Sequence, residues 1–391
     1  MPRIFCFILG VTCNDRMDFF EKVRNLAHRD FDTTDCSDEQ KQLHNAAKCF
    51  LCADEKNAEQ ILRNLYGSTQ YAEMKNFAVD LLFPLLLWQD RFDELAQFGI
   101  PRNNDDQEQI NSYNTKNMTS VLSPISKELP MPPAIADLPA VCVQINGVDV
   151  ELLIDTGALF TMVSESVAKK CGITKSGVSM EAATPLGNSL STQFALIDSF
   201  MVGNCEFKNK SCIVVPDSAY DTGDPDAPTL NGKIGWEIIK NLRWTINYKD
   251  RSVCIEASMV CDKPKNMCCD FFPMVNIKIN GRNVTMGIDT GAGATQFGNC
   301  ESSFYDLEKL EKFTTETFAT GTIVEISGAI IPHIDAQMSG SAFTISNAIL
   351  YPEREYSLSK TFLQPGVLGS DIVQGKTLVI DYPNRNLSVL S

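Results

Sequence analysis

The chain has 391 residues, 44% of them hydrophobic and 21% charged, which is enough apolar material for two or three buried cores. Its formal net charge of −15 argues against a nucleic-acid partner, because phosphate binding needs clustered Lys and Arg. No apolar run approaches the roughly 20 residues of a membrane-spanning helix, so the sequence predicts no membrane span.

Residues 1–13 have the layout of a short signal peptide. Arg3 supplies a positive charge, and an apolar stretch follows from Ile4 to Val11. This layout favours export to a periplasmic or extracellular space, and an ordinary buried segment in a cytoplasmic protein is the alternative. The fourteen cysteines are interpreted mostly as buried or free thiols, with disulfides expected only in an exported protein.

Residues 1–100 are predicted to form a small helical region. Ser37 followed by Gln40 is typical of a capping box, Gly67 is expected to end a helix, and Pro84 is expected to break or kink one. The following residues, 101–140, are polar and dotted with proline, and this composition predicts a linker. All residues assigned to chemistry lie beyond it, so we expect catalysis on small peptides to survive removal of both parts.

From Val141 onward the pattern changes to short strands separated by Gly and Asn. Asn146-Gly147 lies between two alternating apolar runs and predicts the two-residue turn of a β-hairpin. The remainder of the chain keeps this character, so the fold is predicted to be mainly β after the helical region.

The β region contains an internal repeat. Ile145-Asn146-Gly147 recurs 134 residues later as Ile279-Asn280-Gly281, and Asp155-Thr156-Gly157-Ala158 recurs at the same offset as Asp289-Thr290-Gly291-Ala292. The same offset relates Thr161 to Thr295, Gly187 to Gly321, Gly235 to Gly369 and Tyr248 to Tyr382. A constant offset over more than a hundred residues predicts a tandem duplication, with lobes at 141–257 and 275–391 and a connection at 258–274.

Each repeat has an apolar run that ends in Asp-Thr-Gly, and an apolar–Gly pair follows eighty residues after the Asp. These residues resemble the retropepsin and pepsin clan of aspartic peptidases, in the retropepsin form because Ala follows the Gly. The resemblance covers about 250 residues, and the combination with a helical region is similar to bacterial aspartyl protease family proteins. It implies two retropepsin-like β lobes around a bilobal cleft.

The resemblance implies that Asp155 and Asp289 form the catalytic dyad of an aspartic endopeptidase that acts on peptides or proteins. Two close carboxyl groups share one proton, so the pair supplies both the base and the acid of hydrolysis. Hairpin flaps would cover the cleft, with Gly187 and Gly321 as their candidates. The turn-supporting residues are Thr156, Gly157, Ala158, Thr290, Gly291 and Ala292.

Two other functions stay open at this point. The chain could be a non-cleaving, peptide-binding relative that keeps the cleft. Alternatively, each repeat could pair with a repeat of another chain. A catalytically competent monomer is the expectation, since both lobes are already joined in one chain. The third Asp-Thr-Gly, which begins at Asp221, follows no apolar strand and is interpreted as a loop. The three histidines are scattered and no HExxH motif exists, so no metal or cofactor is predicted.

Overall fold

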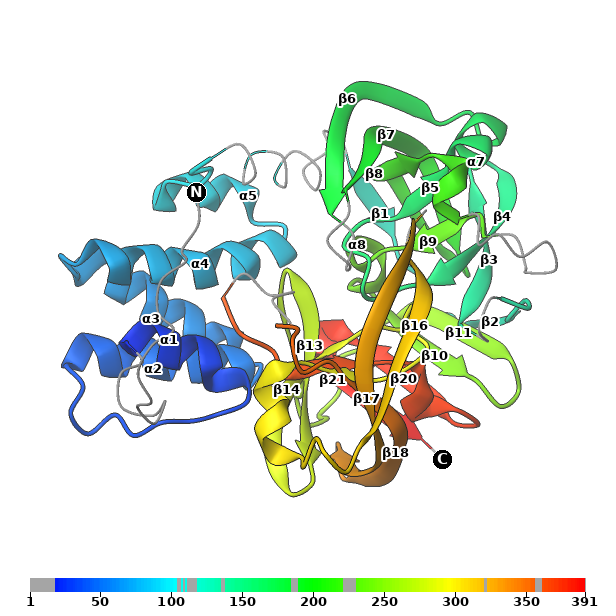
Figure 1. The fold of residues 1–391 in the computed structure, drawn as a ribbon. Helices are drawn as coiled ribbons and strands as arrows, with labels where there is room; N and C mark the ends of the chain where they lie inside the picture. The colour runs from blue at the N-terminus through cyan, green and yellow to red at the C-terminus, as the bar shows by residue number, and fades with distance from the viewer. Residues whose placement is uncertain are drawn as a thin grey trace.

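The computed structural model describes residues 18–103, 107, 110, 118–134, 138–183, 189–220, 230–319, 322–355 and 361–390. Within this part the chain forms a helical region, two β lobes and a sheet that joins the lobes (Figure 1). The predicted fold class, mainly β with two lobes behind a helical region, is confirmed. The segment 1–13, expected to be a signal peptide, lies outside the described residues.

The helical region gathers on one side of the molecule, as Figure 1 shows. Its helices are α1 Phe19–Arg24, α2 Asp38–Leu51, α3 Glu55–Ser68, α4 Ala72–Trp88 and α5 Phe92–Leu95, with short 3₁₀ turns η1 Asn25–Ala27 and η2 Ala96–Phe98. The capping box is confirmed: the Ser37 hydroxyl accepts from the backbone N–H of Gln40, and the Gln40 side chain accepts from the backbone N–H of Ser37.

Neither Gly67 nor Pro84 ends the helix that contains it. The helix α3 continues through Gly67 to Ser68, and α4 continues through Pro84 to Trp88. The side chains from Leu81 to Trp88 are all buried, so tertiary packing holds the helix on both sides of the proline.

The first lobe contains a closed sheet. Its strands are β3 Ala140–Ile145, β4 Val148–Ile154, β5 Met162–Ser164, β6 Thr174–Ala183, β7 Ser189–Val202, β8 Cys205–Val215 and β9 Gly232–Ile234, with α7 Glu165–Lys170, η4 Asp217–Tyr220 and α8 Trp236–Ile239 between or after them. Pairing runs β3–β4–β9–β5–β8–β7 and returns to β3, which closes the sheet, while β6 pairs with β7 outside this ring.

The second lobe has the same strand order. Its strands are β13 Phe272–Ile279, β14 Arg282–Ile288, β15 Gln296–Phe297, β16 Glu311–Ala319, β17 Thr322–Met338, β18 Ser341–Leu350 and β19 Gly366–Leu368, with η5 Asn299–Phe304 and η6 Ser370–Val373. Pairing runs β13–β14–β19–β15–β18–β17 and returns to β13. The β16–β17 hairpin extends from this lobe (Figure 1).

The first hairpin of each lobe has the turn that the sequence predicts. Asn146 and Gly147 have positive φ, as do Asn280 and Gly281, and each pair joins strands in direct register. Such turns match the right-handed twist of the strands they connect.

A third sheet joins the lobes in the order β2–β11–β10–β20–β21. It consists of β2 Lys127–Pro130, β10 Leu242–Asn247, β11 Ser252–Ala257, β20 Thr377–Asp381 and β21 Asn386–Leu390, with η7 Tyr382–Asn384 in the last hairpin. At its centre Thr245 lies opposite Val379, the residue 134 positions later. An approximate two-fold axis therefore passes between these residues.

Two predicted connections contain regular structure. Within 101–140, β1 Thr119–Val121 pairs with β8 and β2 pairs with β11, because each adds to an otherwise open strand edge. Within 258–274, β12 Met267–Asp270 pairs with β13. The predicted linker and connection are thus partly built into the lobes.

The helical region packs onto the β lobes. Asn276 of the second lobe donates to the backbone carbonyl of Leu51 at 2.7 Å, and the ring of Phe271 contacts Phe83 edge-on with centroids 5.2 Å apart. The buried apolar side chains of the helices and of both lobes form one continuous cluster. None of the described helices is both long and apolar enough to cross a membrane.

Candidate active site

Two equivalent strands carry the two aspartates to the junction between the lobes. Asp155 follows β4 and Asp289 follows β14, and each strand lies parallel to a short strand of its own lobe, β9 or β19. The backbone N–H of Asp155 donates to Ile234, and that of Asp289 donates to Leu368. These bonds fix both turns on the strands beside them.

A reciprocal pair of threonines fastens the two turns together. The backbone N–H of Thr156 donates to the Thr290 hydroxyl at 3.1 Å, and the backbone N–H of Thr290 donates to the Thr156 hydroxyl at 3.0 Å. Each hydroxyl donates in turn across the junction, from Thr156 to the carbonyl of Ile288 and from Thr290 to that of Ile154. Both threonines are fully buried, so these bonds form out of contact with water.

The two glycines of the turns bring the carboxyl groups face to face. A Cβ placed on Gly157 would lie 2.6 Å from Cγ of Asp289, and one on Gly291 would lie 2.5 Å from Cγ of Asp155. Each carboxyl group therefore rests against the backbone of the opposite turn, at a distance that no side chain except that of glycine allows.

Backbone N–H groups orient one oxygen of each carboxyl group. Asp155 Oδ1 accepts from Gly157 at 2.9 Å and from Ala158 at 3.1 Å, and Asp289 Oδ1 accepts from Gly291 at 2.8 Å. Neither Ala158 nor Ala292 carries a hydroxyl that could bond the second oxygen.

Lys233, a residue that the sequence analysis does not single out, bonds the second oxygen of Asp155. Its Nζ lies 2.7 Å from Asp155 Oδ2; the Asp155 side chain is only 4% exposed and that of Lys233 is 27% exposed. Lys233 belongs to β9, and its equivalent in the second lobe is the buried apolar residue Val367. That difference between the repeats is the sequence signal that identifies it.

The ion pair makes the two aspartates electrostatically different. Burial would raise the pKa of Asp155, but the adjacent Lys233 ammonium and the hydrogen bonds to its carboxylate hold that pKa below its usual range. Burial, followed by the negative charge of Asp155, raises the pKa of Asp289 to about 8. The two shifts have opposite directions, so the arrangement favours a shared proton on the Asp289 side of the pair.

A second tier of side chains is equivalent in the two lobes. The hydroxyls of Thr161 and Thr295 accept from the backbone N–H groups of Gly235 and Gly369, each at 3.2 Å. Glu237 accepts from the backbone N–H of Thr161, and Asp371 accepts from the backbone N–H and hydroxyl of Thr295. The later apolar–Gly segments thus brace the segments that follow the aspartates.

Some predicted site residues lie outside the described part of the chain. The flap candidates Gly187 and Gly321 are among them, although the strands β6–β7 and β16–β17 on either side are described and paired. The Asp-Thr-Gly at Asp221 also lies outside it.

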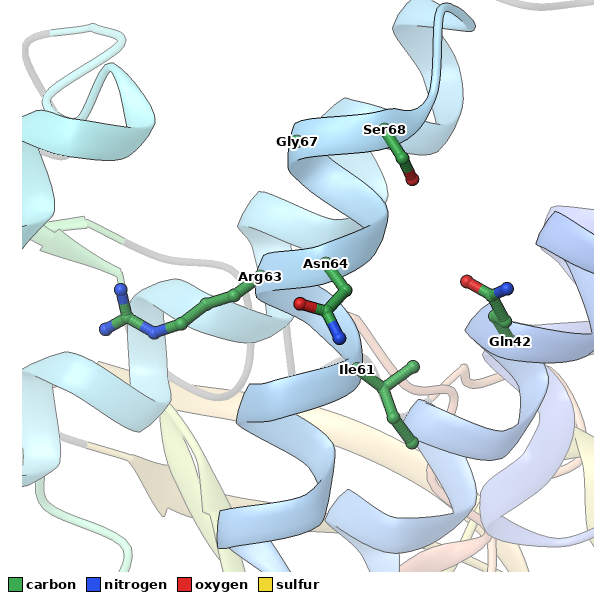
Figure 2. Close-up of a pocket in the computed structure, with 6 residues that line it drawn as sticks. All are labelled: Gln42, Ile61, Arg63, Asn64, Gly67 and Ser68. Atoms are coloured by element: carbon green, nitrogen blue, oxygen red, sulfur yellow. The ribbon is translucent and has the colours of Figure 1, made fainter.

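A separate hollow lies between α2 and α3 and shares no residue with the aspartate site (Figure 2). Its lining comes from Gln42 on α2 and from Ile61, Arg63, Asn64, Gly67 and Ser68 on α3. The guanidinium of Arg63 is held by Glu59 and Glu94, so it is already neutralised. Among the described residues, no group of three or more His, Cys, Asp or Glu side chains is placed to hold a metal ion.

Residues 141–237 match the family model described as aspartyl protease. This part of the chain is similar to aspartyl proteases. The matched aspartyl protease segment includes Asp155, Lys233 and Glu237 and ends before the second lobe, whose likeness to the first rests on strand order and on the 134-residue offset. No curated protein matches the chain.

Proposed function

We propose that the protein is an aspartic endopeptidase whose dyad is Asp155 and Asp289. The observation that carries the proposal is the junction of the two turns, in which reciprocal threonine bonds hold each carboxyl group against the opposite glycine. We also infer that the lobes are a tandem duplication of a retropepsin-like unit, because the closed strand order is the same in both.

The proposed reaction uses the two protonation states of the pair. The Asp155 carboxylate takes a proton from a water molecule while the water oxygen bonds to the peptide carbonyl carbon, and Asp289 gives its proton to the carbonyl oxygen. The resulting diol then breaks its C–N bond: Asp155 gives its proton to the leaving nitrogen, and Asp289 takes one back from a diol hydroxyl. The dyad ends in its starting state.

A single chain supplies both halves of this site. The threonine bonds and the pairing of β10 with β20 all form within one polypeptide, so we propose that a monomer is catalytically competent. Extended peptides or proteins are the proposed substrates, because the dyad lies at the junction between the two lobes.

The Lys233–Asp155 ion pair favours a second function. A lysine that engages a dyad oxygen suits a peptide-binding module that does not cleave. The two functions make opposite predictions for the same cleavage assay.

The test is cleavage of casein and of a peptide library by the wild-type protein and by Asp155→Asn and Asp289→Asn. We expect wild-type cleavage, blocked by a statine-type transition-state mimic, and a loss of at least about 100-fold in each variant because half of the acid–base pair is missing. Asp221→Asn is the matched control, with the same tripeptide and unchanged activity. Cleavage that persists in Asp155→Asn contradicts the dyad, and binding without cleavage in the wild type favours the second function.

A further inference from the structure

The lysine at the dyad has no counterpart in the other lobe. The short strands β9 and β19 occupy equivalent places, with Lys233 opposite Leu153 and Val367 opposite Gly287. Val367 is buried among Phe272 and Tyr351, whereas the ammonium of Lys233 reaches the carboxylate of Asp155. The approximate two-fold symmetry of the backbone is therefore broken by one charge at its centre.

The charged and titratable groups around Lys233 explain why it stays there. Among the described residues these groups are Asp155 at the end of β4, Asp289 at the end of β14, and Tyr220 at the end of η4. Burial disfavours the ammonium, but the charge of Asp155 more than offsets this and raises the pKa of Lys233. Lys233 therefore carries a positive charge beside Asp155 at neutral pH.

Tyr220 adds a polar group beside this pair. It is 8% exposed, and its hydroxyl has no hydrogen-bond partner among the described residues. Burial raises the pKa of this phenol, so it remains neutral and adds no charge to the site. The lysine is therefore the group that breaks the electrostatic symmetry of the dyad.

We propose that Lys233 is a positioning residue of the dyad: its ammonium keeps Asp155 ionised before water attacks, so that Asp155 is the base and Asp289 the acid of that first step. This inference rests on the proposed peptidase function and extends it. A dyad of identical carboxyl groups can place its shared proton on either side, whereas the 2.7 Å contact to Asp155 Oδ2 selects one side before substrate binds.

Removal of the charge should move both limits of the pH–rate profile. Without Lys233, Asp155 takes a proton more readily as pH falls, and a dyad with two protons has no base. Lys233 also opposes the rise in the pKa of Asp289, so its removal should move the alkaline limit upward as well. A residue with a merely structural role would lower activity without moving either limit.

The experiment compares the pH dependence of kcat/KM in wild type, Lys233→Met and Lys233→Arg. In Lys233→Met we expect the activity at pH ~4, relative to the maximum of the same protein, to fall about ten-fold, which corresponds to a one-unit shift of the acid limit. Lys233→Arg keeps the charge and should keep the wild-type profile. Lys175→Met, which removes an exposed ion pair with Glu165 in the same lobe, is the matched control and should change nothing.

A second measurement separates this inference from the proposed function. Carboxyl ¹³C titration by NMR, with signals assigned by their loss in Asp155→Asn and Asp289→Asn, reports the dyad without any substrate. Two well-separated steps in wild type that approach each other in Lys233→Met support the inference even if no peptide is cleaved. Cleavage by wild type with superimposable profiles and titrations in Lys233→Met overturns it and leaves the peptidase proposal standing; a uniform gain in activity in Lys233→Met also overturns it.

Discussion

Gly157 is the residue at which the site tolerates least change. A methyl group there would lie 2.6 Å from Cγ of Asp289, and it cannot escape because the threonine bonds fix the turn. We expect Gly157→Ala to lower kcat/KM at least about 100-fold by displacing the opposite carboxyl group. Peptide cleavage and thermal melting measure the two consequences.

The control for that variant is Gly67→Ala. Gly67 lies in the last turn of α3, and apart from its chain neighbours and the backbone of its own helix no atom lies within 4 Å of an added Cβ. Alanine there should stabilise the helix by about 0.5–1 kcal/mol and leave cleavage unchanged. Full activity of Gly157→Ala would show that the carboxyl groups do not need the close approach seen here.

The pH dependence of activity follows from the one proton that the dyad holds. The pKa of Asp155 lies below its usual range, so Asp155 is already ionised in acidic solution. The pKa of Asp289 is raised to about 8, so Asp289 keeps its proton up to that pH. Activity should therefore extend from acidic to neutral pH and fall above about 8 as Asp289 ionises and the acid is lost. The measurement is kcat/KM against pH; a rate that climbs steadily into alkaline solution contradicts the assignment of the acid.

The repeat predicts that Asp155 and Asp289 occupy equivalent positions, whereas it shows only that Lys233 and Val367 differ and not that Lys233 reaches a carboxylate. Asp155 and Asp289 stand out because the repeat places them at one offset after apolar strands. Lys233 lies 78 residues after Asp155 in the printed sequence, and only the parallel pairing of β4 with β9 brings its side chain to the carboxylate. Contacts between strands that are distant in sequence are the part that periodicity and spacing do not encode.

At the scale of elements, the helical region is a structural partner of the second lobe. Arg385, in the turn between β20 and β21, makes two bonds to Glu55 of α3, at 2.6 and 2.7 Å. Leu363 donates through its backbone N–H to Arg24, and Phe362 contacts Phe50. The sequence predicts that this region can be removed without loss of catalysis, and the continuous core argues against it, because removal would expose these apolar faces.

The contribution of this packing to the free energy of unfolding can be measured through the Arg385–Glu55 ion pair. Both side chains are largely shielded, at 16% and 13% exposed. Loss of one partner of a buried ion pair costs about 3–5 kcal/mol, and for this partly exposed pair we expect about 1–3 kcal/mol from Glu55→Gln. Thermal melting or urea unfolding measures the change.

The matched comparison is Glu308→Gln, which removes an exposed pair with Lys312. Surface pairs are worth less than about 1 kcal/mol, so its melting temperature should stay close to that of wild type. Equal stability of the two variants would mean that the helices contribute little to the lobes.

Hairpins and linkers show which elements a sequence can specify. Asn146-Gly147 fixes its turn locally through positive φ, and the prediction was correct without tertiary information. The strands β1 and β2 gave no local signal, because Thr119–Val121 and Lys127–Pro130 are short and exposed and exist only as additions to β8 and β11. Pro84 by itself favours a break in the helix, but α4 continues through it because the surrounding side chains are buried.

At the scale of the whole molecule, the single-chain site can be tested by complementation. We expect a mixture of Asp155→Asn and Asp289→Asn proteins to stay inactive, because each chain pairs its own lobes through β10–β20 and through Thr156–Thr290. Tethered lobes have an effective concentration of order millimolar, which favours pairing within the chain.

Dilution provides the second half of that test. Wild-type activity per molecule should not change between micromolar and nanomolar protein. Activity that returns in the mixture with second-order dependence on concentration would show that lobes exchange between chains.

Lys233 is present in only one of the two lobes, and this asymmetry depends on both lobes belonging to one chain. Two identical lobes assembled from separate chains would carry this lysine twice, and each ammonium would keep its own aspartate ionised, which leaves two bases and no acid. In one chain the position can be Lys233 on one side and Val367 on the other. The two sides of the site therefore differ chemically, which is impossible in a symmetric pair of lobes. A bound peptide has a base on one side and an acid on the other before any bond is broken.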